Sequence, residues 1–96
     1  MPIFILLSTL TQQGVQTLKS NPERLRQVNH DVEELGCRVL HQWATLGEFD
    51  VVSVVEAADV ETIAAASVAL AARGSVKIQS LPALPIADFL RKFRDD

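Results

Sequence analysis

A glycine-led tetrapeptide in the middle of the chain, Gly47-Glu48-Phe49-Asp50, is the feature that most constrains the fold. It separates two runs that both have the composition of strands, Cys37–Leu46 and Val51–Glu56. Glycine supplies the positive φ that tight turns often need, Phe49 can cover the end of a hairpin, and Asp50 can accept hydrogen bonds from nearby backbone amides. The sequence therefore predicts a tight hairpin turn and a central antiparallel pair of strands.

Two of the predicted strands have apolar residues on both faces. Ile3–Leu7 and Val51–Val55 are almost continuously apolar and lack the strict alternation of a strand with one face in water. Such strands belong in the centre of a sheet. Because a chain of 96 residues is too short to cover both faces of that sheet, we expect a second copy to cover one of them. The protein is therefore predicted to be a homo-oligomer.

Helical patterns fill most of the remaining chain. Two helical pieces follow the first strand, and a third helix begins at an Asp59 N-cap and carries a small-residue stripe that includes Val60 and Val68. A fourth strand is predicted over Val76–Leu81, ended by Pro82 and followed by an amphipathic tail helix. This β-α-β-β-α-β order predicts an α+β, ferredoxin-like sandwich with helices on one face of an antiparallel sheet and an extra C-terminal helix. We expect a single domain over residues 1–96.

Composition argues against several classes of function. A formal net charge of −3 offers no basic surface for phosphates, so no nucleic-acid partner is expected. The opening apolar run is short and lacks a basic leader, which argues against a signal peptide or a membrane span and favours the cytoplasm. One cysteine, Cys37, and the scattered His30 and His41 exclude an internal disulfide and predict no metal site. No cofactor is expected, and no catalytic signature is present.

The candidate ligand-binding residues lie on and beside the two middle strands. Alternation along Cys37–Leu46 predicts that Cys37, Val39, His41 and Trp43 share one face. On that face His41 and Trp43 can line a pocket between the sheet and a partner, with Ser53 on the neighbouring strand, and Asp50 adds a carboxylate. The alternative roles are interface packing for His41 and Trp43 and turn chemistry for Asp50. Cys37 is expected to be a buried thiol.

Several short segments, spread over nearly the whole chain, together carry a family resemblance. They are Thr11-Gln12-Gln13-Gly14-Val15 after the opening strand, Asn21-Pro22-Glu23-Arg24, the tetrapeptide at 47–50 followed by Val51–Ala57, and Gly74 before the last strand. In these segments the chain resembles the GYD-domain family of small bacterial proteins. Phe49 stands where that family has its tyrosine, so no role that needs a phenolic hydroxyl is expected here. The resemblance implies a fold similar to dimeric α/β-barrel proteins and implies no catalytic residues.

Two classes of function are compatible with these patterns. The first is an oligomeric small-molecule-binding or regulatory module, whose clefts between subunits hold a small metabolite. The alternative is a cofactor-independent dimeric α/β-barrel enzyme, monooxygenase- or isomerase-like, in which a histidine or a polar pair handles protons. The polar residues available to such a pocket are His41, Ser53, Ser8 and Gln79, and they contain no evident acid–base dyad. The sequence favours the module.

Overall fold

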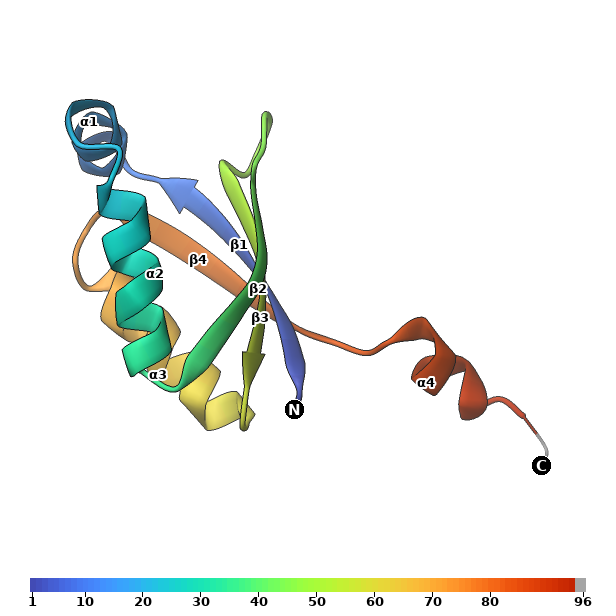
Figure 1. The fold of residues 1–96 in the computed structure, drawn as a ribbon. Helices are drawn as coiled ribbons and strands as arrows, with labels where there is room; N and C mark the ends of the chain where they lie inside the picture. The colour runs from blue at the N-terminus through green and yellow to red at the C-terminus, as the bar shows by residue number, and fades with distance from the viewer. Residues whose placement is uncertain (95–96) are drawn as a thin grey trace.

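A computed structural model describes residues 1–94 and contains four strands and four helices in that range (Figure 1). They are β1 (Ile3–Leu10), α1 (Gln12–Ser20), α2 (Arg24–Glu34), β2 (Cys37–Ala44), β3 (Val51–Ala57), α3 (Val60–Ala71), β4 (Val76–Ala83) and α4 (Ile86–Arg91). The order confirms the predicted ferredoxin-like α+β arrangement with an extra C-terminal helix. No helix within residues 1–94 has the length and apolar character needed to cross a membrane.

The sheet has the strand order β2-β3-β1-β4, and every neighbouring pair is antiparallel. The two strands predicted from their continuous apolar sequence to be central, β1 and β3, are the central ones. Helices α1, α2 and α3 lie on one side of the sheet, and the other side carries no helix (Figure 1). The α/β-barrel expectation is not supported, because the sheet is open and ends in the edge strands β2 and β4.

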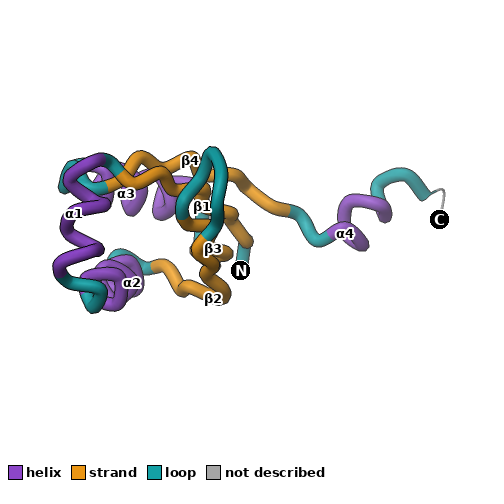
Figure 2. The backbone as a smooth tube through the Cα atoms, turned by 90° about the horizontal axis from the view of Figure 1, so that it is seen from above, coloured by secondary structure: helices purple, strands orange, loops and turns teal. Residues whose placement is uncertain are grey.

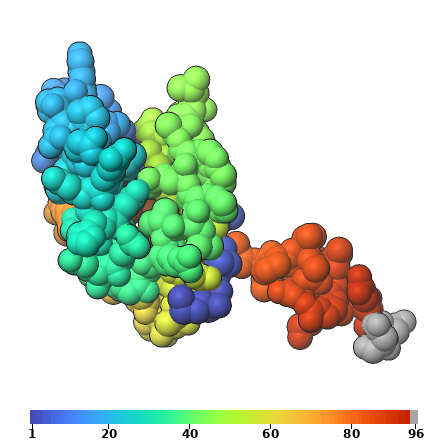
Figure 3. Space-filling model, viewed as in Figure 1, coloured from blue at the N-terminus to red at the C-terminus, as the bar shows by residue number. Residues whose placement is uncertain are grey.

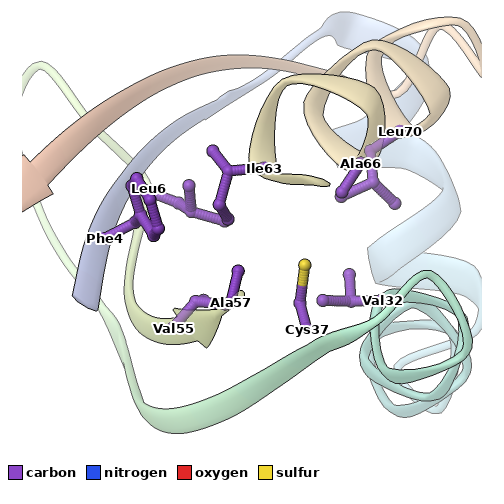
Figure 4. Close-up of a cluster of buried hydrophobic side chains, with 9 residues drawn as sticks. All are labelled: Phe4, Leu6, Val32, Cys37, Val55, Ala57, Ile63, Ala66 and Leu70. Carbon is purple, nitrogen blue, oxygen red and sulfur yellow. The ribbon is translucent and has the colours of Figure 1, made fainter. Parts of the chain in front are cut away.

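The hydrophobic core lies between the sheet and the helices (Figure 4). It consists of nine buried side chains from both layers: Phe4, Leu6, Val32, Cys37, Val55, Ala57, Ile63, Ala66 and Leu70. Helix α3 contributes the last three, at spacings of three and four residues. The stripe predicted for this helix is wrong at Val60 and Val68, which are exposed. Because α3 is rich in alanine, apolar residues surround much of the helix and do not mark its buried face.

A β-bulge in β2 reverses the faces of that strand. Val39 pairs with Val55, whereas His41 pairs with Val54, so Leu40 is an extra residue in the ladder. Val55 faces the core and Val54 the opposite side. Cys37 and Val39 therefore face the helices, whereas His41 and Trp43 face the open side of the sheet. The prediction that all of these residues share one face is wrong, because it assumed an uninterrupted alternation.

The connection between β2 and β3 is a six-residue loop over residues 45–50, longer than the predicted tight turn. Within it Gly47 has a φ of 123°, which confirms the positive backbone angle predicted for this glycine. The backbone N–H of Thr45 donates to the carbonyl of Asp50 over 2.8 Å, and the Thr45 hydroxyl donates to the carbonyl of Phe49 over 2.6 Å. These bonds close the loop where the ladder between the two strands ends.

Strand β4 and the tail differ from the prediction in one respect. β4 continues through Pro82, which pairs with Phe4, and ends at Ala83. Proline is tolerated here because β4 is an edge strand, where one side of the backbone has no partner strand. Beyond Pro85, α4 projects away from the other helices and forms a separate lobe (Figures 2 and 3). The exposed apolar residues of the tail are Leu84, Ile86, Phe89, Leu90 and Phe93.

Candidate functional site

The four predicted ligand-binding residues are divided between two faces and a loop. His41 and Trp43 lie on the open face, where their rings stack with centroids 5.5 Å apart and planes 11° apart. Trp43 is 52% exposed. Ser53 points to the opposite side of the sheet, beneath the helices, and is only 5% exposed. The structure therefore brings His41 and Trp43 together and separates them from Ser53.

Asp50, the fourth predicted residue, joins the β2–β3 loop to the end of β1. Its carboxylate oxygen Oδ2 accepts a hydrogen bond from the backbone N–H of Leu10 over 2.8 Å. Its own backbone N–H donates to the carbonyl of Ser8, also over 2.8 Å. The predicted ability of Asp50 to accept a backbone hydrogen bond is confirmed, and the donor comes from a distant strand. This carboxylate holds the loop against the sheet.

The open face of the sheet is a continuous apolar strip with polar borders. The register places Trp43, Val52, Leu7 and Gln79 in one row across the four strands. The neighbouring row runs from His41 through Val54 and Ile5 to Leu81. The central members of both rows are half-buried by their neighbours, and the strip carries no helix. We call these eight residues, His41, Trp43, Val52, Val54, Ile5, Leu7, Gln79 and Leu81, the open-face strip.

Charged side chains flank the strip at its two edges. On the β2 side, Arg38 lies next to Glu56 of β3, with a nitrogen-to-oxygen distance of 3.8 Å. On the β4 side, Lys77 is exposed and pairs in register with Thr9. An apolar centre with a polar rim is the composition of a protein-binding surface.

The polar residues considered for an enzyme pocket do not form one group. His41 and Gln79 lie on the open face, in different rows, whereas Ser8 and Ser53 point to the helix side. The sheet itself separates the two pairs, so no histidine–serine pair among these four residues can cooperate in a proton transfer within one chain. Among residues 1–94, no group of three or more histidine, cysteine or acidic residues is placed to hold a metal ion.

Cys37 faces the core and is 4% exposed. Burial raises the pKa of its thiol above the ordinary value, which keeps the sulfur protonated and weakly nucleophilic. Within residues 1–94, no positively charged group offsets the effect of burial on this pKa. The environment is that of a packing residue, as predicted.

Sequence reasoning missed a polar cluster on the helix side of the sheet. The side-chain amides of Asn29 and Gln42 exchange hydrogen bonds of 2.8 and 3.2 Å, and Gln42 Nε2 also donates to Ser53 Oγ over 2.9 Å. One signal was present: Asn29 lies four residues after Leu25 and three before Val32, so it occupies the apolar stripe of α2. A polar residue in such a stripe needs a hydrogen-bond partner.

Comparison with known proteins agrees with this architecture. The family model of the GYD domain matches residues 4–92. A protein of Thermus thermophilus, described as "Glutamine synthetase and cystathionine beta-lyase binding protein", is 50% identical over 95 residues. The match covers 98% of this chain and 100% of the relative. No solved structure matches the chain. The family model spans nearly all of the chain, and this chain therefore belongs to the GYD domain family.

Proposed function

We propose that this protein is a small binding module that regulates other proteins by docking to them through the open-face strip. The observation that carries the proposal is the apolar face of the sheet, which neither the three packed helices nor α4 covers. Monomeric proteins rarely expose a contiguous apolar surface of this kind unless it binds something. Trp43 is half exposed within the strip, and tryptophan is among the residues that contribute most to protein–protein binding.

The proposed partners are metabolic enzymes of the kind named for the Thermus relative. Half of the residues are identical over the full length of that protein, whose description states that it binds glutamine synthetase and cystathionine beta-lyase. Identity at this level over complete chains supports a shared mode of action. Glutamine synthetase and cystathionine beta-lyase are therefore the first two partners to test.

Self-association through the same strip is the finer part of the proposal. A second copy presents an identical apolar face, and a two-fold axis that lies in the interface, parallel to the sheet, would bury both strips at once. A partner enzyme and a second copy would then compete for one surface. We also propose a cytoplasmic location, which is supported by the metabolic enzymes named as partners of the Thermus relative.

The test uses two matched variants. Val54→Lys puts a charge in the centre of the open-face strip, whereas Val68→Lys makes the same change on the exposed surface of α3. Binding to purified glutamine synthetase and cystathionine beta-lyase is measured by biolayer interferometry. We expect wild type and Val68→Lys to bind at least one enzyme and Val54→Lys to bind at least about tenfold more weakly.

The outcomes separate the two parts of the proposal. Failure of the folded wild-type protein to bind either enzyme would overturn protein docking as its function. Equal binding by the two lysine variants would move the docking surface away from the strip. Sedimentation velocity at micromolar concentration tests self-association: a wild-type dimer that becomes a monomer in Val54→Lys supports it, and a wild-type monomer contradicts it.

A further inference from the structure

A cavity of about 120 Å³ lies on the helix side of the sheet, beneath α1 and α2. Figure 3 shows it as a hollow between the cyan atoms of the α1–α2 segment and the green atoms of β2. It exists because the core fills only one end of the space between sheet and helices. Phe4, Leu6 and Val55 are buried in that core, and the last two also border the cavity. Ser8 and Val51, further along the same face, line the cavity and are only partly buried.

The end wall of the cavity is held in place by the start of α1. The hydroxyl of Thr11 accepts from the backbone N–H of Gly14 over 3.1 Å and donates to the carbonyl of Gly74 over 2.6 Å. The backbone N–H of Thr11 donates to the carbonyl of Ser75 over 3.0 Å. Gly14 itself packs so closely that an added Cβ would lie 2.0 Å from the Ser75 carbonyl oxygen. The wall is therefore anchored without a ligand, as expected of a preformed site.

The floor of the cavity carries hydrogen-bond donors that are not used within the cluster of Asn29, Gln42 and Ser53. Asn29, Gln42 and Ser53 all line the cavity. Gln42 Nε2 gives its two hydrogens to Asn29 Oδ1 and Ser53 Oγ, and Gln42 Oε1 accepts one hydrogen of Asn29 Nδ2. Within residues 1–94, the hydrogen of the Ser53 hydroxyl and the second hydrogen of Asn29 Nδ2 have no side-chain acceptor in this cluster. The remaining lining is mainly aliphatic, with Val28, Val39 and Ile78 among it.

From this geometry we propose that the cavity binds a small apolar molecule that carries one oxygen as a hydrogen-bond acceptor. The aliphatic walls bury the apolar body, and Ser53 and Asn29 donate to the oxygen. The volume fits a single ring: an apolar cavity of comparable size, about 150 Å³, binds benzene in another protein. This site is separate from the open-face strip, because the sheet lies between them, so the proposal stands independently of protein docking.

Phenol and toluene are the probes, since they differ by a hydroxyl in place of a methyl group. Binding is followed by methyl and amide chemical shifts of the isotope-labelled full-length protein at millimolar probe. We expect shifts at Val28, Val39 and Ile78, none at the Trp43 indole, and tighter binding of phenol than of toluene. Shifts confined to Trp43 and its neighbours, or no shifts up to the solubility of both probes, would overturn the proposal.

Two variants test the two parts of the site. Val28→Phe fills the cavity and should weaken both probes at least about tenfold, while Val68→Phe makes the same change on an exposed part of α3 and should leave binding intact. Ser53→Ala removes one of the two donors and should reduce the preference for phenol over toluene, with the Asn29 amide left to donate. Preserved binding in a folded Val28→Phe, or an undiminished preference for phenol in Ser53→Ala, would contradict the assignment. If Val28→Phe does not fold, the probe shifts of the wild-type protein and the Ser53→Ala comparison decide.

Discussion

The carboxylate of Asp50 accepts a hydrogen bond from the backbone N–H of Leu10, across 2.8 Å and forty positions of sequence. The bond closes the ladder between β1 and β3 at the point where the β2–β3 loop enters the sheet. A tetrapeptide that looks like local turn chemistry thus contributes a long-range contact. The charge of the acceptor strengthens the bond relative to a bond between neutral groups.

Asp50→Ala should therefore destabilise the protein by about 1–2 kcal/mol, because the partly buried Leu10 N–H loses its acceptor. Urea denaturation measures the change in the free energy of unfolding. Glu48→Ala is the matched control in the same loop, since within residues 1–94 the backbone carbonyl of Glu48, and not its side chain, accepts a hydrogen bond, which comes from the Thr9 hydroxyl. Equal stability of the two variants would show that the carboxylate of Asp50 is not structural and would leave it available for a ligand.

Gly14→Ala should destabilise the protein although it lies in a helix. In an exposed helix this change normally gains up to about 1 kcal/mol, but here the new Cβ would meet the Ser75 carbonyl at 2.0 Å. The obstacle is backbone, so α1 must move away from the β4 side. We expect a loss of roughly 1–3 kcal/mol, measured by thermal melting. Gln16→Ala, on an exposed position of the same helix, should be neutral or stabilising; the same result for Gly14→Ala would refute the close contact.

Gly47→Val tests the cost of backbone strain alone, because the new Cβ would make no close contact. Nothing lies within 4 Å of the position that a Cβ would occupy at Gly47, yet its φ is 123°. The cost of the substitution is therefore conformational, and we expect roughly 1–3 kcal/mol. Glu48→Val is the control, because no residue other than glycine has a positive φ among residues 1–94. If melting temperatures of both variants match the wild type, Gly47 has no structural role.

The features that the sequence predicted are those that depend on local composition. Ile3–Leu7 and Val51–Val55 identified the central strands because only strands covered on both faces are apolar throughout. Gly47 indicated a positive φ because few other residues tolerate one. The family resemblance rested on the same local segments. These properties do not require knowledge of which strand pairs with which.

The features that the sequence did not predict depend on pairing in three dimensions. Nothing in the alternation of β2 marks Leu40 as an extra residue, because the bulge arises where the ladder meets β3. The reversal that follows placed His41 and Ser53 on opposite faces and divided the predicted site. The Asn29–Gln42 pair joins a helix to a strand. The sequence marked Asn29 as a polar residue in an apolar stripe, but it did not identify the partner of that residue.

Acid should weaken the N-terminal cap of α3. Asp59 Oδ1 accepts from the hydroxyl and from the backbone N–H of Thr62, over 2.6 and 2.8 Å. These two bonds, the hydroxyl first, hold the pKa of the Asp59 carboxyl below its ordinary 3.8. Because the folded-state pKa is the lower one, the stabilisation is fully present above the unfolded-state value and is lost as the pH falls through the folded-state value.

Asp59→Asn removes the charge but keeps an N-cap acceptor, because an amide oxygen can accept the same hydrogen bonds and does not titrate in this range. Thermal melting at a series of pH values from about 2 to 6 should show the wild type more stable than Asp59→Asn above the ordinary pKa, with the difference shrinking on acidification. Glu61→Gln removes an exposed carboxylate from the same helical turn without touching the cap. Two results would mean that the Asp59–Thr62 bonds do not depend on the carboxylate charge. The first is a difference in melting temperature between wild type and Asp59→Asn that stays constant with pH. The second is the same pH-dependent difference between wild type and Glu61→Gln.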